Sequence, residues 1–185
     1  MGIKLDNLIV VDVEATCWKK NPPPGEEQEV IEVGICLLEV SSGNLLEKES
    51  ILVKPERSRV SEFCTKLTTL TQAQVDEGVS FAKACALLQD KYIAHQRVWA
   101  SYGEFDKNIF TKQCQYRQVS YPFSNRHLNV KTLFAVMNGL EREVGMARAL
   151  TLLNLPLEGT HHRGGDDAWN IARILSQLIG KGMGN

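Results

Sequence analysis

The alternation of hydrophobic and polar residues predicts strands in the first third of this chain. Residues 7–13 (NLIVVDV) form a nearly continuous apolar run, which is typical of a central strand buried on both faces. Residues 29–40 and 44–54 flank the turn sequence SSGN and together predict an antiparallel hairpin. Residues 19–27, with three consecutive prolines, are expected to form a loop, because proline lacks the backbone donor that regular pairing needs.

Helical spacing of the apolar residues begins at Val60 and predicts a helix-rich remainder. The longest helical stretch is expected around residues 80–95, and a short strand at 98–102 follows it. The pattern then predicts four more helices, near residues 104–116, 130–138, 145–154 and 166–180. Three strands, then helices with a further strand and room for one more short strand, indicate an α/β fold in which helices cover a mixed sheet.

Composition predicts one soluble domain over residues 1–185. The chain is 43% hydrophobic and 23% charged, which is ordinary for a globular protein with a proper core. Its uninterrupted apolar runs are only a handful of residues long, so we expect no membrane span and a cytoplasmic location. Five cysteines, an odd number with no CxxC pair, argue against a disulfide framework or a zinc ribbon and predict mostly buried, reduced thiols.

Two acids one residue apart, Asp12 and Glu14, stand at the end of the first predicted strand. Residues i and i+2 of a strand lie on the same face, about 6 to 7 Å apart, so the two carboxylates would repel each other. A buried strand end that gathers like charges must either protonate one of them or bind a cation, for which a divalent metal is the usual solution. The pair therefore predicts further acidic ligands downstream.

Helical phase selects one acid from each of two later pairs. Asp106 falls on the apolar face of its predicted helix, and Glu104 falls on the polar face. In the last predicted helix, Asp167 heads an apolar stripe, whereas Asp166 falls among polar residues and is expected to face solvent or cap the helix. We therefore expect Asp106 and Asp167 to point inward. For Asp106 the alternative stays open that it only complements the helix dipole from the first turn.

His161 and His162 precede the last predicted helix, on a loop made flexible by two glycines. A histidine in such a place titrates near neutral pH and can serve as a general base. A lone loop histidine is more often structural, but this pair stands close in sequence to Asp167. Zinc is the competing interpretation, although no cysteine or histidine neighbour has the spacing of a zinc finger.

The net charge of −1 gives no overall basic signature of nucleic-acid binding. Metal bound to the four acids would leave the rest of the chain positive, and a local basic rim could then form. Each candidate member, taken singly, fits an ordinary solvated surface at least as well. The candidates are Lys19, Lys20, Lys107, Lys112, Arg126 and Arg163.

Taken in order, DVE, an FD at a helix start and H-x4-D at the opening of the last helix resemble the DEDDh superfamily of 3′ to 5′ exonucleases. The resemblance spans nearly the whole chain, and its finer form is to the branch that acts on small RNAs and on histone messenger and ribosomal RNA ends. It implies a ribonuclease H-like fold, with a five-stranded mixed β-sheet flanked by α-helices and the first three strands antiparallel. The matching segments are EATCW (14–18), CTKLTTLTQAQVDEG (64–78), SYGEFD (101–106), NVKTLF (129–134) and HHRGGDDAWNIARI (161–174).

The resemblance also implies a catalytic site with two Mg²⁺ ions, for which Mn²⁺ can substitute. One ion would be held by Asp12, Glu14 and Asp167, and Asp12 would bridge to the second. Asp106 would act on that second ion, largely through water. His162, five residues before Asp167, would deprotonate the attacking water, whereas His161 has the wrong spacing. The catalytic set implied in this way is Asp12, Glu14, Asp106, His162 and Asp167.

A nucleotide pocket follows from the same resemblance. Apolar contacts grip a base without reading its identity, which fits a sequence-tolerant trimming enzyme. The family commonly shows LTGIT where this chain has LTTLT, so Thr69 stands in place of a glycine; if that position needs a positive φ, a β-branched residue would resist it. Glu32 could line the cleft or simply pair with a basic side chain. The residues implied to contact the terminal nucleotide are Ala15, Thr16, Cys17, Leu67, Thr68 and Leu70.

The sequence therefore favours a metal-dependent 3′ to 5′ exonuclease that releases 5′-nucleoside monophosphates from single-stranded ends, of RNA rather than DNA. The alternative is a non-catalytic nucleic-acid-binding or regulatory protein on the same fold. The complete set of acids speaks against that alternative, because a pure binder has no need to concentrate like charge. No GxSxG, GxxxxGK[ST] or HExxH motif supports another kind of hydrolase. The natural RNA and the oligomeric state are left open.

Overall fold

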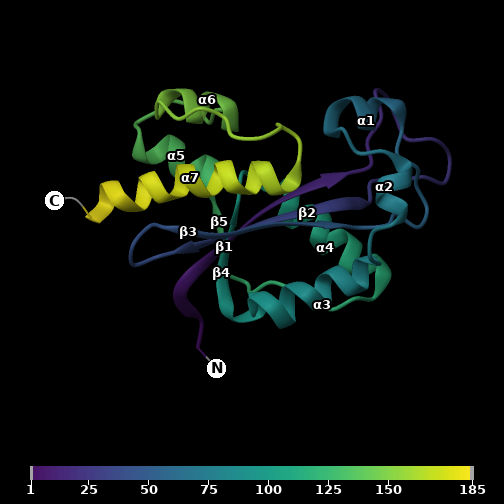
Figure 1. The fold of residues 1–185 in the computed structure, drawn as a ribbon, viewed down its shortest axis with the longest axis horizontal. Helices are drawn as coiled ribbons and strands as arrows, with labels where there is room; N and C mark the ends of the chain where they lie inside the picture. Colours follow the sequence, from purple (N-terminus) through teal and green to yellow (C-terminus); the bar gives the residue numbers. More distant parts are fainter. Residues whose placement is uncertain (1, 184–185) are drawn as a thin grey trace.

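A five-stranded mixed sheet forms the centre of the computed structural model, which describes residues 2–183, with side chains to residue 180 (Figure 1). The strands are β1 (Lys4–Ala15), β2 (Val30–Glu39), β3 (Leu45–Leu52), β4 (Arg97–Ser101) and β5 (His127–Asn129). Their order is β3-β2-β1-β4-β5. β1, β2 and β3 are antiparallel neighbours, whereas β4 pairs in parallel with β1 and with β5. The expected sheet, with its first three strands antiparallel, is confirmed.

Helices cover both faces of this sheet. They are α1 (Glu62–Thr68), α2 (Gln72–Asp76), α3 (Phe81–Tyr92), α4 (Phe105–Arg117), α5 (Val130–Met137), α6 (Met146–Leu152) and α7 (Gly164–Met183). In Figure 1, α5, α6 and α7 lie above the sheet and α3 and α4 lie below it. The short helices α1 and α2 lie near the end toward which β1 runs. The α/β architecture expected from the sequence is therefore present.

β1 is buried on both faces because its side chains alternate between two apolar cores. The odd-numbered residues that begin with Ile9 pack in the core with α3 and α4, whereas Leu8 and Val10 pack in the core with α5, α6 and α7. Asp12 and Glu14 continue the even-numbered series along the same strand. The two acids therefore lie on the α7 face of the sheet, where the apolar series ends.

Gly34 in β2 permits a very close approach of α7 to the sheet. A Cβ atom placed on Gly34 would lie 1.8 Å from the carbonyl carbon of Gly164, the first residue of α7. Gly34 is also the residue that pairs with Asp12 across the β1–β2 ladder. The N-terminus of α7 consequently starts directly on the sheet, beside the first acid of the predicted site.

The predicted elements are present, with differences in length. The stretch expected at 80–95 forms α3, which ends at Tyr92 because Ile93 takes a left-handed conformation (φ 51°) and its N–H bonds to the carbonyl of Leu88. The expectation that this is the longest helix is wrong, because α7 has 20 residues against 12 in α3. The further short strand is β5, with three residues.

All five cysteines are free and four of them are buried, as expected for reduced thiols. Within residues 2–183, no helix is both long and apolar enough to cross a membrane.

Thr69 takes the left-handed conformation that a glycine would favour. It is the C-terminal cap of α1, with φ at 64°, and its N–H donates to the carbonyl of Thr65 at 2.9 Å. A β-branched residue in this region of φ is strained by roughly 1–2 kcal/mol, because its Cβ crowds the following carbonyl. The chain therefore folds with a strained residue next to the segment that carries Leu67.

Replacing Thr69 by glycine should relieve this strain. We expect Thr69→Gly to raise the free energy of unfolding by about 1 kcal/mol, measured by urea denaturation. Thr65→Gly in the interior of the same helix is the matched control, and it should lower stability by about 0.3–0.5 kcal/mol, because glycine is a poorer helix former than threonine. A destabilised Thr69→Gly protein would contradict the assignment of strain to this residue.

Candidate active site

Three acids from two distant segments meet at the end of β1. Oxygen atoms of Asp12, Glu14 and Asp167 all lie within 4.8 Å of one another. Glu14 and Asp167 are only 7% and 3% exposed, and Asp12 is half-buried. The first turn of α7 supplies Asp167, which lies there because the apolar stripe behind it packs on the sheet. Helical phase therefore predicted the right member of the Asp166 and Asp167 pair.

Asp167 has one carboxylate oxygen in use and one without a partner. Its Oδ2 accepts the backbone N–H of His162 at 2.9 Å and lies 2.8 Å from Nδ1 of His161. Its Oδ1 is buried and has no hydrogen-bond partner. An unpaired buried carboxylate oxygen is costly unless a hydrogen-bond donor or a cation satisfies it. Here the carboxylates of Asp12 and Glu14 lie close enough to share a cation with Asp167. This donor set fits a divalent cation, which prefers carboxylate oxygens.

Asp106 approaches the same place from α4, on the opposite side of the sheet end. It is 4% exposed, and its Oδ1 accepts the backbone N–H of Val13, the residue between the two acids of β1, at 3.0 Å. Asp106 therefore points inward, as its helical phase predicted. Glu104 remains exposed on the outer face and pairs with Lys107 at 3.5 Å.

Burial and mutual repulsion make these acids hard to ionise. Burial first, then the neighbouring charges of Asp106, Glu14 and Asp167, raise the pKa of Asp12 well above its usual value. The pKa of Glu14 is raised to about 8 by burial and by nearby acids, and burial raises the pKa of Asp106 to about 6. A bound cation would favour the ionised forms and so remove this cost.

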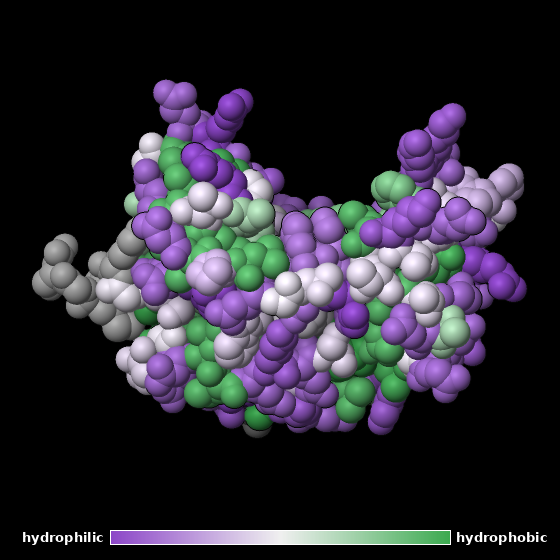
Figure 2. All heavy atoms as spheres, turned by 45° about the horizontal axis from the view of Figure 1, so that its top comes forward, coloured by the Kyte–Doolittle hydropathy of each residue, from purple (hydrophilic) through white to green (hydrophobic). Residues whose placement is uncertain are grey.

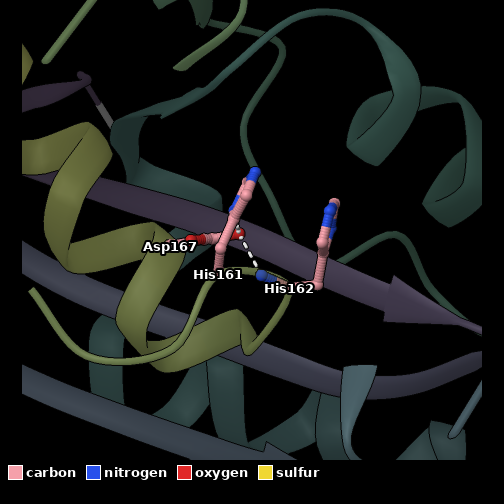
Figure 3. Close-up of side chains that lie close together, drawn as sticks. All are labelled: His161, His162 and Asp167. Atoms are coloured by element: carbon pink, nitrogen blue, oxygen red, sulfur yellow. Dashed lines mark hydrogen bonds and ion pairs between the residues drawn. The ribbon is translucent and has the colours of Figure 1, made fainter. Parts of the chain in front are cut away.

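His161 and His162 stand side by side next to Asp167 (Figure 3). Their rings are stacked, with centroids 4.0 Å apart. His162 has a left-handed backbone (φ 64°), and its pKa is lowered by burial and then by the neighbouring His161. The ring of His161, rather than that of His162, contacts Asp167. The assignment of His162 as the base, in preference to His161, stays a prediction.

The acids and both histidines open into one cavity of about 400 Å³. Figure 2 shows the surface hollowed between the part of the molecule that carries α6 and the part that carries α1. Six lining residues were not predicted from the sequence to belong to the site: Val13, Gln28, Tyr102, Phe105, Met146 and Ile171. Phe105 carried a usable signal, since it is an aromatic residue beside Asp106 that helical phase directs outward, and it is 48% exposed. A larger cavity of about 550 Å³, beside Trp99 and His127, has no acid among its lining residues.

The six residues expected at the nucleotide divide into two groups. Ala15, Cys17 and Leu67 line the cavity. Thr16, Thr68 and Leu70 are fully buried instead. The hydroxyl of Thr16 bonds to the Glu27 carbonyl, that of Thr68 bonds to the Cys64 carbonyl, and Leu70 packs in a small apolar core. The side chains of this second group therefore do not line the cavity. The sequence motif alone did not show which of its residues the fold would bury.

Half of the expected basic rim is engaged in ion pairs. Arg163 pairs with Glu32 at 2.9 Å, Lys107 with Glu104 at 3.5 Å and Lys112 with Glu27 at 3.3 Å. The remaining members, Lys19, Lys20 and Arg126, are exposed. Glu32 thus pairs with a basic side chain, which was one of its two predicted roles. Asp166 lies outside the acid cluster; its side chain is 22% exposed, and it pairs with Lys48.

Comparison with known proteins agrees with this geometry. The family model described as Exonuclease (RNase T) matches residues 9–175. The 3′-5′ exoribonuclease 1 of Homo sapiens is 29% identical over 188 residues, which cover 96% of this chain and 53% of that protein. The chain spans about half or less of the length of the curated exoribonucleases 1 and 2 that it matches.

Solved structures of other nucleases resemble the whole fold. The nuclease domain of 3′hExo, a DEDDh family member bound to rAMP, matches with a TM-score of 0.87 at 28% identity, covering 96% of this chain and 93% of that chain. A 3′-exonuclease structure that concerns 3′-end specific recognition of histone mRNA stem-loop gives a TM-score of 0.85 at 28% identity, covering 98% of this chain and 66% of that chain. The ribonuclease H-like fold of the DEDDh exonucleases is therefore confirmed.

Metal-free protein should lose stability as the pH rises toward 8. The pKa of Glu14 is raised from 4.5 to about 8 on folding, so its contribution to stability is complete below pH 4.5 and is lost as the pH rises through 8. In EDTA we expect the melting temperature to fall by several degrees over this range, and Glu14→Gln should flatten the fall. Mg²⁺ added to the wild-type protein at pH 8 should restore its melting temperature.

The exposed acid Glu141 provides the matched control, because Glu141→Gln removes the same charge away from the site and should leave the pH dependence unchanged. Parallel curves for wild type and Glu14→Gln would contradict the raised pKa.

Proposed function

The chain belongs to the RNase T exonuclease family, and on that premise we propose that it is a divalent-metal-dependent 3′ to 5′ exonuclease acting on single-stranded RNA ends. The observation that carries this proposal is the meeting of Asp12, Glu14 and Asp167, with one orphaned buried oxygen, at a cavity also lined by Asp106 and two histidines. We further propose that Mg²⁺ is the natural ion, that Mn²⁺ can substitute for it, and that 5′-nucleoside monophosphates are the products.

The proposed roles follow from where each side chain lies. Asp12, Glu14 and Asp167 would hold one divalent ion, and Asp106 would contribute to a second through water. When bound, such ions stabilise charge on the attacked phosphate and make water a better nucleophile. His162 would take the proton from that water, because its lowered pKa leaves the ring neutral and able to accept at neutral pH.

The cavity walls support a single-stranded substrate. Leu67 and Phe105 line the cavity and are 37% and 48% exposed, so they offer apolar surface on which a terminal base can stack. Stacking does not read base identity, which fits removal of any terminal nucleotide. The preference for RNA over DNA rests on the relatives, which include an exoribonuclease and a nuclease domain bound to rAMP. Cytoplasmic location and a single domain over residues 1–185 stay predictions.

The proposal is tested by product analysis on matched 3′-labelled and 5′-labelled substrates. Purified protein with Mg²⁺ should shorten single-stranded RNA from its 3′ end, degrade single-stranded DNA more slowly, and stop in EDTA. Asp12→Asn should lower the rate about 100-fold or more, because it removes charge from the proposed ligand set.

Glu104→Gln is the control that separates site chemistry from general loss of negative charge. It removes an exposed acid two residues from Asp106 and should keep the rate within about twofold. Mononucleotide release that persists in EDTA or in Asp12→Asn would refute the proposed chemistry. Metal-independent RNA binding without turnover would favour the non-catalytic alternative.

A further inference from the structure

Glu32 is an acid beside the metal-binding cluster whose carboxylate is already supplied with donors. It is 0% exposed and lies on β2 directly across from Glu14. Arg163 donates to both of its oxygens, from Nη2 to Oε1 at 2.9 Å and from Nε to Oε2 at 3.2 Å. The backbone N–H of Gly164 donates to Oε2 at 2.7 Å, and the Ser50 hydroxyl donates to Oε1. Four donors leave Glu32 little capacity for a cation, unlike the acids of the cluster.

The segment that Glu32 holds is the one that carries two groups of the site. Arg163 follows His162 and precedes Asp167 by one helical turn. The N–H of Asp167 donates to the carbonyl of Arg163 at 2.8 Å, and the N–H of His162 donates to Asp167 at 2.9 Å. His162 itself is held in a left-handed conformation. A strained residue keeps its conformation only where its neighbours are fixed, and here the fixed neighbour is Arg163.

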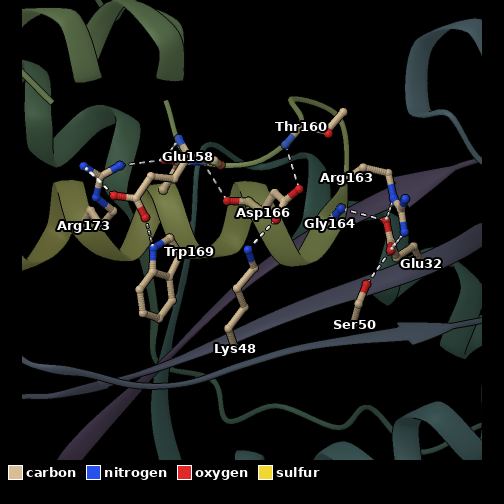
Figure 4. Close-up of polar contacts among 11 residues, drawn as sticks. Glu32, Lys48, Ser50, Glu158, Thr160, Arg163, Gly164, Asp166, Trp169 and Arg173 are labelled. Atoms are coloured by element: carbon tan, nitrogen blue, oxygen red, sulfur yellow. Dashed lines mark hydrogen bonds and ion pairs between the residues drawn. The ribbon is translucent and has the colours of Figure 1, made fainter. Parts of the chain in front are cut away.

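We propose that the Glu32–Arg163 ion pair is a positioning device, which sets His162 and Asp167 against Asp12 and Glu14; the idea rests on the proposed exonuclease function. An arginine fork on a carboxylate fixes both the distance and the orientation of the two groups. The pair therefore joins the start of α7 to β2 in one register (Figure 4). Its loss would leave the fold in place and displace the two groups by a fraction of an ångström or more.

A second ion pair at the same helix end serves as a comparison. Lys48 of β3 pairs with Asp166 of α7, with side chains 38% and 22% exposed (Figure 4). Asp166 also accepts the N–H of Thr160 at 2.7 Å. Because water screens an exposed pair, breaking it should have little effect on the position of the site.

The test compares Arg163→Lys with Lys48→Met in the full chain. Arg163→Lys keeps the positive charge and removes the fork. With single-stranded RNA and Mg²⁺, we expect kcat to fall about 10-fold to 100-fold while KM stays within about threefold, because misplaced groups slow the chemical step more than they weaken binding. Lys48→Met should keep kcat within about twofold. In metal-free protein, amide hydrogen exchange over residues 158–166 should be at least about tenfold faster in Arg163→Lys only.

Wild-type kcat in Arg163→Lys, with or without faster exchange, would overturn the proposal, and so would an equal loss of kcat in Lys48→Met. If Arg163→Lys does not fold, Ser50→Ala replaces it, since this variant removes one donor to Glu32 and should give a smaller loss of kcat in the same direction. If wild-type protein releases no nucleotide, the exonuclease function fails, whereas the exchange comparison still decides whether the ion pair holds the segment.

Discussion

The contact between Gly34 and Gly164 is the constraint on which the candidate site depends. No side chain separates the two backbones, and a Cβ on Gly34 would lie 1.8 Å from the Gly164 carbonyl carbon. The first turn of α7 can therefore rest directly on β2, and Asp167 reaches the acids of β1 from there. Any larger residue at Gly34 would lift the helix end from the sheet. Backbone packing thus brings the first turn of α7 to the sheet, within reach of Glu32, which bonds to Arg163 and to the N–H of Gly164.

Around this contact the structure sets buried negative charge against apolar packing. The pKa values of Asp12, Glu14, Asp106 and Asp167 are all raised, with burial as the first cause for each. Such a cluster destabilises a metal-free protein, and the apolar residues on both faces of β1 have to offset it. Stability given up at one place is common at functional sites, because the groups that bind a cation cannot also be paired among themselves.

The site is also assembled from segments that are held by different means. β1 is fixed by pairing with a strand on each side. α7 is fixed by its apolar stripe and by the ion pair with Glu32. Leu67, on the cavity wall, belongs to α1, whose C-terminal cap Thr69 is strained. Half of the candidate basic residues are neutralised by neighbouring acids. Attraction of a phosphate backbone would therefore depend on few exposed cations together with the metal charge itself.

The sequence by itself determined the positions of four strands, most helix positions and the choice of Asp106 and Asp167 over Glu104 and Asp166, because periods of 2 and 3.6 residues are local and set which face a side chain takes. Only the tertiary structure decided which partner each polar group meets. It paired Arg163 with Glu32, brought both histidines to Asp167, and buried Thr16, Thr68 and Leu70 away from the cavity. Those outcomes depend on packing between segments far apart in the chain, which no local period encodes.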